Sequence, residues 1–159
     1  MTRSTRAVRG SLLIAIVIVV ADQLTKAWAL SALDDRDIDV FWTLRFHLTR
    51  NSGMAFSRGE GLGPVIGVLA LVVVAALLVS LGRHRSTAST VAVGLVIGGA
   101  AGNVVDRLFR SPGWLRGAVI DFIDLQWWPI FNVADMAITV GGLLLVFGSV
   151  AASRQVATE

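Results

Sequence analysis

Four long apolar blocks, separated by polar connections, dominate the sequence. They cover about residues 11–33, 64–81, 91–108 and 132–152. Each is close to the roughly 20 residues that an α-helix needs to cross the hydrocarbon core of a bilayer. The pattern predicts an all-α membrane protein with four transmembrane helices, in which residues 1–159 form a single membrane domain.

The first block follows three arginines and by itself resembles a signal peptide. It continues, however, through Asp22 and Lys26 to Leu33, which makes it long enough to span a membrane. We therefore expect a retained first helix. Asp22 and Lys26 are four residues apart and share one helix face, so we expect that face to point into the protein.

The long first connection has a different periodicity. Apolar and polar residues alternate from Ile38 to Leu48, which predicts a strand with one apolar face, and Asn51–Gly53 predicts a turn. An open strand edge is unstable within hydrocarbon, so we expect this small β-sheet, in a loop of about residues 38–57, at the membrane surface. Residues 109–130 are expected to form a loop whose Trp114, Trp127 and Trp128 suit an interfacial belt.

Short-loop charges indicate the orientation. The amino-terminal tail, the Arg83/Arg85 turn and the Arg154 tail carry arginines, which places both termini in the cytoplasm. The long first connection also carries four arginines, so the charge asymmetry is incomplete. With this orientation, the polar residues of blocks one, three and four all fall near the outer surface.

The third block is expected to pack most closely against other helices. It combines glycines at small-xxx-small spacing with a polar end. The glycines are Gly94, Gly98, Gly99 and Gly102, and the polar residues are Asn103, Asp106 and Arg107.

Composition excludes several classes of function. Hydrophobic residues make up 55% of the chain, and the mean hydropathy is +0.73. The chain has no cysteine, which excludes a thiol nucleophile, and its two histidines have no metal-ligand spacing. The net charge of +3 comes from scattered arginines, so we expect no nucleic-acid partner.

The most informative polar residues are Asp121 and Asp135, which lie beside very apolar sequence. A carboxylate at membrane depth costs about 2.5–3.5 kcal/mol on insertion scales, which indicates a functional role. Two neighbouring carboxylates hold one proton between them. One can then activate water while the other donates to a carbonyl, which hydrolyses an amide without a covalent intermediate. The alternative is that they form structural ion pairs with Arg107 and Lys26.

Asparagines near these acids have two interpretations as well. Asn51, Asn103 and Asn132 could orient the carboxylates or hold a peptide, or could simply make interhelical hydrogen bonds. Ser52 and Ser57 are weak nucleophile candidates because no base is visibly placed to activate them.

Three other functions remain open at this point. Asp121, Asp124 and Asp135 could supply ligands to a metal. A proton- or ion-coupled transporter could use charged residues of the first and third blocks as a relay, although no internal repeat is apparent. A purely structural membrane subunit would need no chemistry at all. The relay residues would be Asp22, Lys26, Asp106 and Arg107.

Five polar segments spread over residues 22–135 form a specific combination. They are Asp22–Lys26 (DQLTK), Asn51–Ser57 (NSGMAFS), Gly102–Arg107 (GNVVDR), Val119–Phe122 (VIDF) and Phe131–Asp135 (FNVAD). Together, and in this order, they resemble the lipoprotein signal peptidases, the type II signal peptidases of bacteria (peptidase family A8). The sequence departs from the family pattern at Met54, where a small residue is more usual.

The resemblance implies an aspartic endopeptidase of the bacterial cytoplasmic (inner) membrane, with its active site near the outer face and a β-sheet that cradles the substrate. It would cleave prolipoproteins on the amino side of a diacylglyceryl-modified cysteine. Asp121 and Asp135 would be catalytic, Asp124 has no catalytic counterpart, and no metal or organic cofactor is implied. We expect a monomer whose partners are lipid-modified substrates and membrane lipid. The residues expected to support the site or contact substrate are Asp22, Lys26, Asn51, Gly53, Asn103, Asp106, Arg107 and Asn132.

Overall fold

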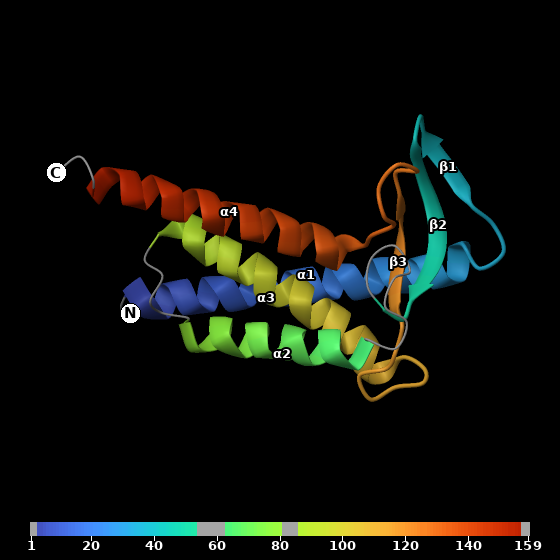
Figure 1. Ribbon diagram of the computed structural model, residues 1–159, viewed down its shortest axis with the longest axis horizontal. Coiled ribbons are helices and arrows are strands. Elements are labelled where there is room, and N and C mark those ends of the chain that lie inside the picture. The colour runs from blue at the N-terminus through green and yellow to red at the C-terminus, as the bar shows by residue number, and fades with distance from the viewer. Residues whose placement is uncertain (1–2, 54–62, 81–85, 157–159) are drawn as a thin grey trace.

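The computed structural model describes residues 3–53, 63–80 and 86–156. Within these ranges the chain forms four helices and one three-stranded sheet. The helices lie side by side, and the sheet stands across one end of them (Figure 1). The start of α1 and the end of α4 are both at the opposite end (Figure 1). The elements in chain order are α1 (Arg3–Ala32), β1 (Ile38–Phe41), β2 (Leu44–Asn51), α2 (Gly63–Ser80), α3 (Thr87–Phe109), β3 (Val119–Asp124) and α4 (Val133–Val156).

The outer faces of the helices are strongly apolar. Side chains such as Leu13, Val17 and Phe147 are more than 60% exposed. Soluble monomers rarely expose contiguous apolar surface on this scale, so these faces suit lipid. Among the described residues, Ser4–Ala32 and Thr87–Phe109 are long and apolar enough to cross a membrane, and Pro64–Ser80 and Val133–Ser149 are shorter apolar helices. Four spans therefore remain a prediction.

Helix α3 lies against all three other helices, and its glycines allow close contact. A Cβ on Gly94 would lie 2.8 Å from the Ser11 carbonyl oxygen, and one on Gly98 would lie 2.8 Å from the Ala15 carbonyl oxygen, both on α1. A Cβ on Gly99 would overlap the Ala134 carbonyl oxygen on α4. The close packing predicted from the glycine spacing is confirmed.

The predicted strand at Ile38–Leu48 is wrong in one respect, because it is a hairpin. Strands β1 and β2 are antiparallel, with Phe41 paired to Leu44 across a turn at residues 42–43. A two-residue turn preserves odd and even positions, so the alternation continues through it and conceals the reversal. Trp42 in this turn has a φ of 50°.

The prediction of a loop throughout residues 109–130 is also wrong, because β3 lies within it. β3 pairs antiparallel with β2, with Ile120 opposite Arg50 and Val119 opposite Asn51. Five of its six residues are buried, and it lacks the apolar–polar alternation of a half-exposed strand. This is why the sequence pattern did not reveal it.

An aromatic cluster fixes the sheet to the end of α1. Phe122 of β3 packs with Ala29 of α1 and with Leu33, the residue that follows the helix. Trp28 lies edge-on to both Phe46 and Phe122, with ring centroids 5.2 and 6.0 Å away. Because successive side chains of a strand point to opposite faces, the burial of Phe122 against α1 turns Asp121 the other way.

Candidate active site

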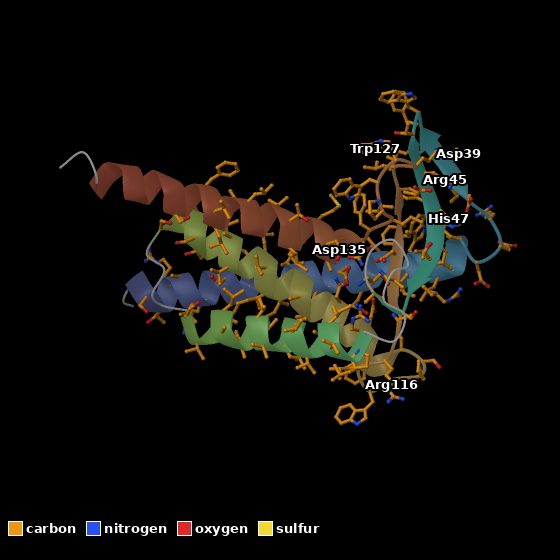
Figure 2. All side chains as sticks on the ribbon, in the orientation of Figure 1. Asp39, Arg45, His47, Arg116, Trp127 and Asp135 are labelled. Carbon is orange, nitrogen blue, oxygen red and sulfur yellow. The ribbon has the colours of Figure 1, made fainter. Side chains whose placement is uncertain are left out.

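Asp121 and Asp135 line one cavity, although they lie on different elements. Asp121 is in β3, and Asp135 is in the first turn of α4, where the bundle meets the sheet (Figure 2). The cavity has a volume of about 410 Å³. Its polar lining includes Asn51, Asn103 and Arg107, and its apolar lining comes mainly from α2 and α3.

Asn132 contacts both aspartates and is completely buried. Its Nδ2 donates to Asp121 Oδ1 at 2.6 Å and to Asn103 Oδ1 at 3.2 Å. Its backbone N–H donates to Asp135 Oδ2 at 3.3 Å, and its Oδ1 accepts from the Asp135 N–H at 2.9 Å. The last two bonds are reciprocal, as in a capping box at the start of a helix. Asn132 thus caps the start of α4 and holds the carboxylates of Asp121 and Asp135 in fixed positions relative to each other.

The remaining carboxylate oxygens accept from two further amides. Asn51 Nδ2 donates to Asp121 Oδ2 at 3.0 Å, and Asn103 Nδ2 donates to Asp135 Oδ1 at 2.8 Å. Asn51 is itself held because its Oδ1 accepts from the Gly53 N–H at 3.1 Å. Among the described residues, no ion pair includes Asp121 or Asp135. The alternative of ion pairs with Arg107 and Lys26 is therefore not what the structure shows.

Burial and the neighbouring Asp135 carboxylate raise the pKa of Asp121 to about 7. The hydrogen bonds from Asn51 and Asn132, and the charge of Lys26, lower the pKa and offset part of this rise. An ordinary aspartate would be fully ionised near neutral pH. With a pKa of about 7, a substantial fraction of Asp121 is protonated at neutral pH, so it can donate a proton.

Arg107 brings an unused donor to the same cavity. Its side chain is buried, and its Nη2 donates to the Gly53 carbonyl at 3.1 Å. Its Nη1 is buried and has no hydrogen-bond partner within the part of the chain that the structure describes. Buried polar groups are nearly always paired, so this donor is suited to a ligand oxygen in the cavity.

Lys26 forms a separate cluster with two other buried charges. Its Nζ lies 2.7 Å from Asp22 Oδ2, 2.8 Å from Asp106 Oδ2 and 3.0 Å from Asn103 Oδ1. An ammonium group has three donors, so Lys26 is fully satisfied. The prediction that Asp22 and Lys26 face the protein interior is confirmed, because both side chains are completely buried.

The two acids of this cluster also hold the backbone beside the cavity. Asp22 Oδ1 accepts from the Ala134 N–H at 3.0 Å, one residue before Asp135. Asp106 Oδ2 accepts from the Ile120 N–H at 3.2 Å, one residue before Asp121. The Lys26 cluster thereby links the two segments that carry Asp121 and Asp135, which we call the cavity acids.

Asp124 lies outside this arrangement. Its Oδ2 accepts from Arg45 Nη2 at 2.6 Å, and its Oδ1 accepts from the Gln126 N–H at 2.6 Å. Burial alone would raise its pKa, but the bonds from Arg45 and Gln126 outweigh burial and hold the pKa below the usual value. A metal site of Asp121, Asp124 and Asp135 is not formed, and the described residues contain no cluster of three or more potential ligands from His, Cys, Asp and Glu.

A second cavity, of about 460 Å³, lies beside Asp135 and is almost wholly apolar. We call it the tryptophan groove. Trp127, on the loop between β3 and α4, lies near the start of α4 (Figure 2). The lining residues are Leu125, Trp127, Trp128, Phe131, Asp135, Met136, Thr139 and Val140. Asp135 is the one residue that lines both cavities described here.

Comparison with known proteins decides the family. Residues 14–151 match the model of signal peptidase (SPase) II. The chain belongs to the signal peptidase II family. Lipoprotein signal peptidase of Mycobacterium leprae is 40% identical over 147 residues, which cover 91% of this chain and 73% of the relative. Lipoprotein signal peptidase of Rhodococcus jostii is 42% identical over 136 residues, which cover 84% of this chain and 68% of the relative.

Solved structures agree with this assignment. A bacterial membrane enzyme determined by the in meso method at 2.3 Å resolution superposes with a TM-score of 0.77 and 28% identity. The superposition covers 90% of this chain and 88% of that enzyme. As a signal peptidase II, the chain is a peptidase of a bacterial membrane, and the resemblance found in its sequence is confirmed.

The structure brings together most of the residues singled out in the sequence of this signal peptidase. Asn51, Gly53, Asn103, Arg107 and Asn132 surround the cavity acids, by the contacts given above. Lys26, Asp22 and Asp106 lie one step away, behind Asn103 and the backbone. Ser52 belongs to the described turn, whereas Ser57 and Met54 lie outside the described residues. Sequence reasoning missed the tryptophan groove, since only folding of residues 125–131 onto α4 creates it.

Proposed function

We propose that this chain is an intramembrane aspartic endopeptidase that removes signal peptides from bacterial prolipoproteins. It cleaves on the amino side of a diacylglyceryl-modified cysteine. The observation that carries the proposal is the placement of Asp121 and Asp135 on one cavity, bridged by Asn132 and unpaired with any cation among the described residues. Membership of the signal peptidase II family supports it independently.

The proposed reaction uses a single proton held by the two acids. Asp121, with a pKa of about 7, carries the proton and donates it to the carbonyl oxygen of the scissile peptide. Asp135 accepts a proton from a water molecule, and the resulting hydroxide attacks the carbonyl carbon. The tetrahedral intermediate then breaks at the C–N bond. Asp135 transfers its proton to the leaving nitrogen, and a hydroxyl of the intermediate returns a proton to Asp121, which restores the starting state of the pair. Asn51, Asn103 and Asn132 keep the carboxylates oriented through these steps.

Arg107 is proposed to hold the substrate backbone. Its Nη1 is the buried donor without a partner among the described residues, and it lies on the cavity. A peptide carbonyl placed there would satisfy this donor and fix the register of the chain beside Asp121 and Asp135. Gly53, whose carbonyl accepts from Nη2, keeps the guanidinium in place.

We also propose a placement in the membrane, which the architecture supports. All four helices cross the bilayer, the sheet lies at the outer surface, and both termini are cytoplasmic. Support comes from the apolar outer faces and from the sheet standing at the end opposite the start of α1 and the end of α4 (Figure 1). The scissile bond would then lie where acyl chains meet headgroups, which suits a substrate anchored by its own lipid. We propose that the enzyme acts as a monomer.

A transport function has less support. Three of its four relay residues are completely buried, with Lys26 paired to both Asp22 and Asp106. The fourth, Arg107, donates to the Gly53 carbonyl and lines the cavity. A proton path would need groups that reach water on both sides.

The test uses purified protein in lipid vesicles with a diacylglyceryl-modified precursor peptide and its unmodified counterpart. Mass spectrometry identifies the products. The proposal expects one cut, directly before the modified cysteine, and no cut in the unmodified peptide. Cleavage at another bond, or equal cleavage of both peptides, would contradict it.

A further inference from the structure

We propose that the tryptophan groove binds an acyl chain of the lipid-modified cysteine, while the cavity lined by Asp121 holds the signal peptide. This inference rests on the proposed function and assigns the two ends of the substrate to two sides of α4. The groove is thus a binding site for a long saturated or unsaturated hydrocarbon chain attached to the residue after the scissile bond.

The first argument is the position of Asp135 between the two cavities. On α4, Asp135 and Ile138 line the cavity with Asp121, whereas Asp135, Thr139 and Val140 line the groove. A substrate cleaved at Asp135 must continue in two directions from that carboxylate. The lipid is attached to the cysteine next to the scissile bond, so its chains begin within a few bonds of Asp135.

The second argument is the chemistry of the groove. Apart from Asp135 and Thr139 its lining is hydrophobic or aromatic, and Trp127, Trp128, Met136 and Val140 are each about half exposed or more. An extended peptide backbone would leave its N–H and C=O groups unpaired against such a surface, which is unfavourable. A hydrocarbon chain has no such groups, and each methylene that it buries adds to its affinity.

The third argument is that hydrogen bonds hold the loop that forms the wall of the groove, residues 125–131, in place. Asp124 anchors the loop through its bonds from Arg45 and the Gln126 N–H. Phe131 closes it by exchanging backbone hydrogen bonds with Ile123 at 2.9 and 3.1 Å. Trp127 and Trp128 lie edge-on to each other, with ring centroids 6.1 Å apart. This gives Asp124, which has no part in the chemistry, a role as a positioning residue for the lipid site.

The central experiment measures kcat/KM for precursor peptides that carry long or short acyl chains. Val140→Trp fills the groove, and Leu144→Trp is the matched control one turn further along α4, outside the lining. We expect the parent enzyme to prefer the long chain by at least roughly tenfold, the effect of about two buried methylenes. Val140→Trp should remove most of that preference, whereas Leu144→Trp should keep it. Equal chain-length dependence in all three enzymes would overturn the proposal.

A second pair of variants tests the wall. Asp124→Ala releases the loop, and Asp37→Ala removes the other acid partner of Arg45 without touching the loop. We expect Asp124→Ala to raise KM for the long-chain substrate several-fold with kcat unchanged, and Asp37→Ala to leave both constants unchanged. A fall in kcat alone, or the same effect from Asp37→Ala, would show that Asp124 does not act through the groove.

A photoreactive diazirine at the end of the acyl chain locates the chain directly. In Asp121→Asn, which binds without turnover, label on residues 125–144 supports the proposal. Label on α2 would place the chain in the other cavity, and label spread over the outer face of α1 would show ordinary lipid contact; either result overturns it. If the proposed function itself were wrong, the parent enzyme would not cleave any lipid-modified peptide. That result is distinct from a label in the wrong place.

Discussion

Two groups of buried acids lie side by side in this protein and differ in their partners. Asp22 and Asp106 are bonded to Lys26, and Asp106 also to Arg110 Nε at 2.6 Å. Asp121 and Asp135 are bonded only to neutral amides and border a cavity. Ion pairs satisfy the oxygens of the first group, whereas the second group is oriented by amides and faces a cavity where a substrate can reach it. The difference separates the residues that hold the site from those that we propose react in it.

The largest expected effect comes from the cavity acids. Asp121→Asn and Asp135→Asn each remove one member of the pair, so the rate of cleavage should fall by at least roughly 10²–10⁴-fold. The unfolding temperature should stay the same or rise, because a neutral amide avoids the cost of burying a group that can carry a charge. Peptide cleavage and thermal unfolding are measured on the same preparation, with Asp39→Asn on the exposed strand β1 as the control. A lower unfolding temperature, or a normal rate of cleavage, would mean that Asp121 and Asp135 hold the structure together, as Asp22 and Asp106 do.

The next largest effect is on stability. Lys26→Met leaves Asp22 buried without a cation and should cost about 3–5 kcal/mol of unfolding free energy. Asp106 keeps Arg110. The double variant Lys26→Met/Asp22→Asn should therefore recover more than half of the loss, as measured by denaturant unfolding in detergent. Full stability of the single variant would mean that the Lys26 cluster does not hold the bundle together.

A smaller effect is expected from a methyl group placed against the same cluster. In Gly102→Ala, the new Cβ would lie 2.6 Å from Asp22 Oδ2. Lys26 Nζ holds this oxygen, and the Ala134 N–H holds the other oxygen of the same carboxylate. We expect a loss of about 1–3 kcal/mol. Gly142 has open space around it, so Gly142→Ala should be neutral or stabilising by up to about 1 kcal/mol. Equal stability of the two variants would show that Asp22 can move freely.

The smallest effect concerns pH. Cleavage needs the proton on Asp121, so the rate should decline as pH rises through about 7. The bond from Asn51 lowers the pKa of Asp121. Asn51→Ala should therefore move this decline to higher pH. His47→Ala, on the same strand but bonded to Asp37, is the control that should leave the profile unchanged. A decline at lower pH in Asn51→Ala would contradict the proposal that the Asn51 bond lowers the pKa of Asp121 and that cleavage needs its proton.

The sequence predicts the helices better than the sheet, for physical reasons. Long apolar blocks and glycine spacing are local signals, and the central position of α3 follows from them. The hairpin at Trp42 is hidden because a two-residue turn keeps the alternation in phase. Strand β3 is buried on both faces, so it has no periodic signature.

The site was predictable as a set of residues but not as a geometry. An acid in apolar sequence is conspicuous, which is why Asp22, Asp121 and Asp135 stand out. Which acids meet a cation depends on contacts between segments about 80 residues apart, such as Lys26 with Asp106. The capping role of Asn132 needs the exact start of α4, and the tryptophan groove needs the fold of residues 125–131.

The central claim is that the cavity acids hold one shared proton, carried by Asp121, near neutral pH. Infrared spectroscopy detects it directly, because a protonated carboxyl has a carbonyl band that a carboxylate lacks. The account predicts such a band at low pH, its loss with a midpoint of about pH 7, and its absence in Asp121→Asn. A band that persists in Asp121→Asn with the same midpoint, or no band at any pH near neutral, would contradict it.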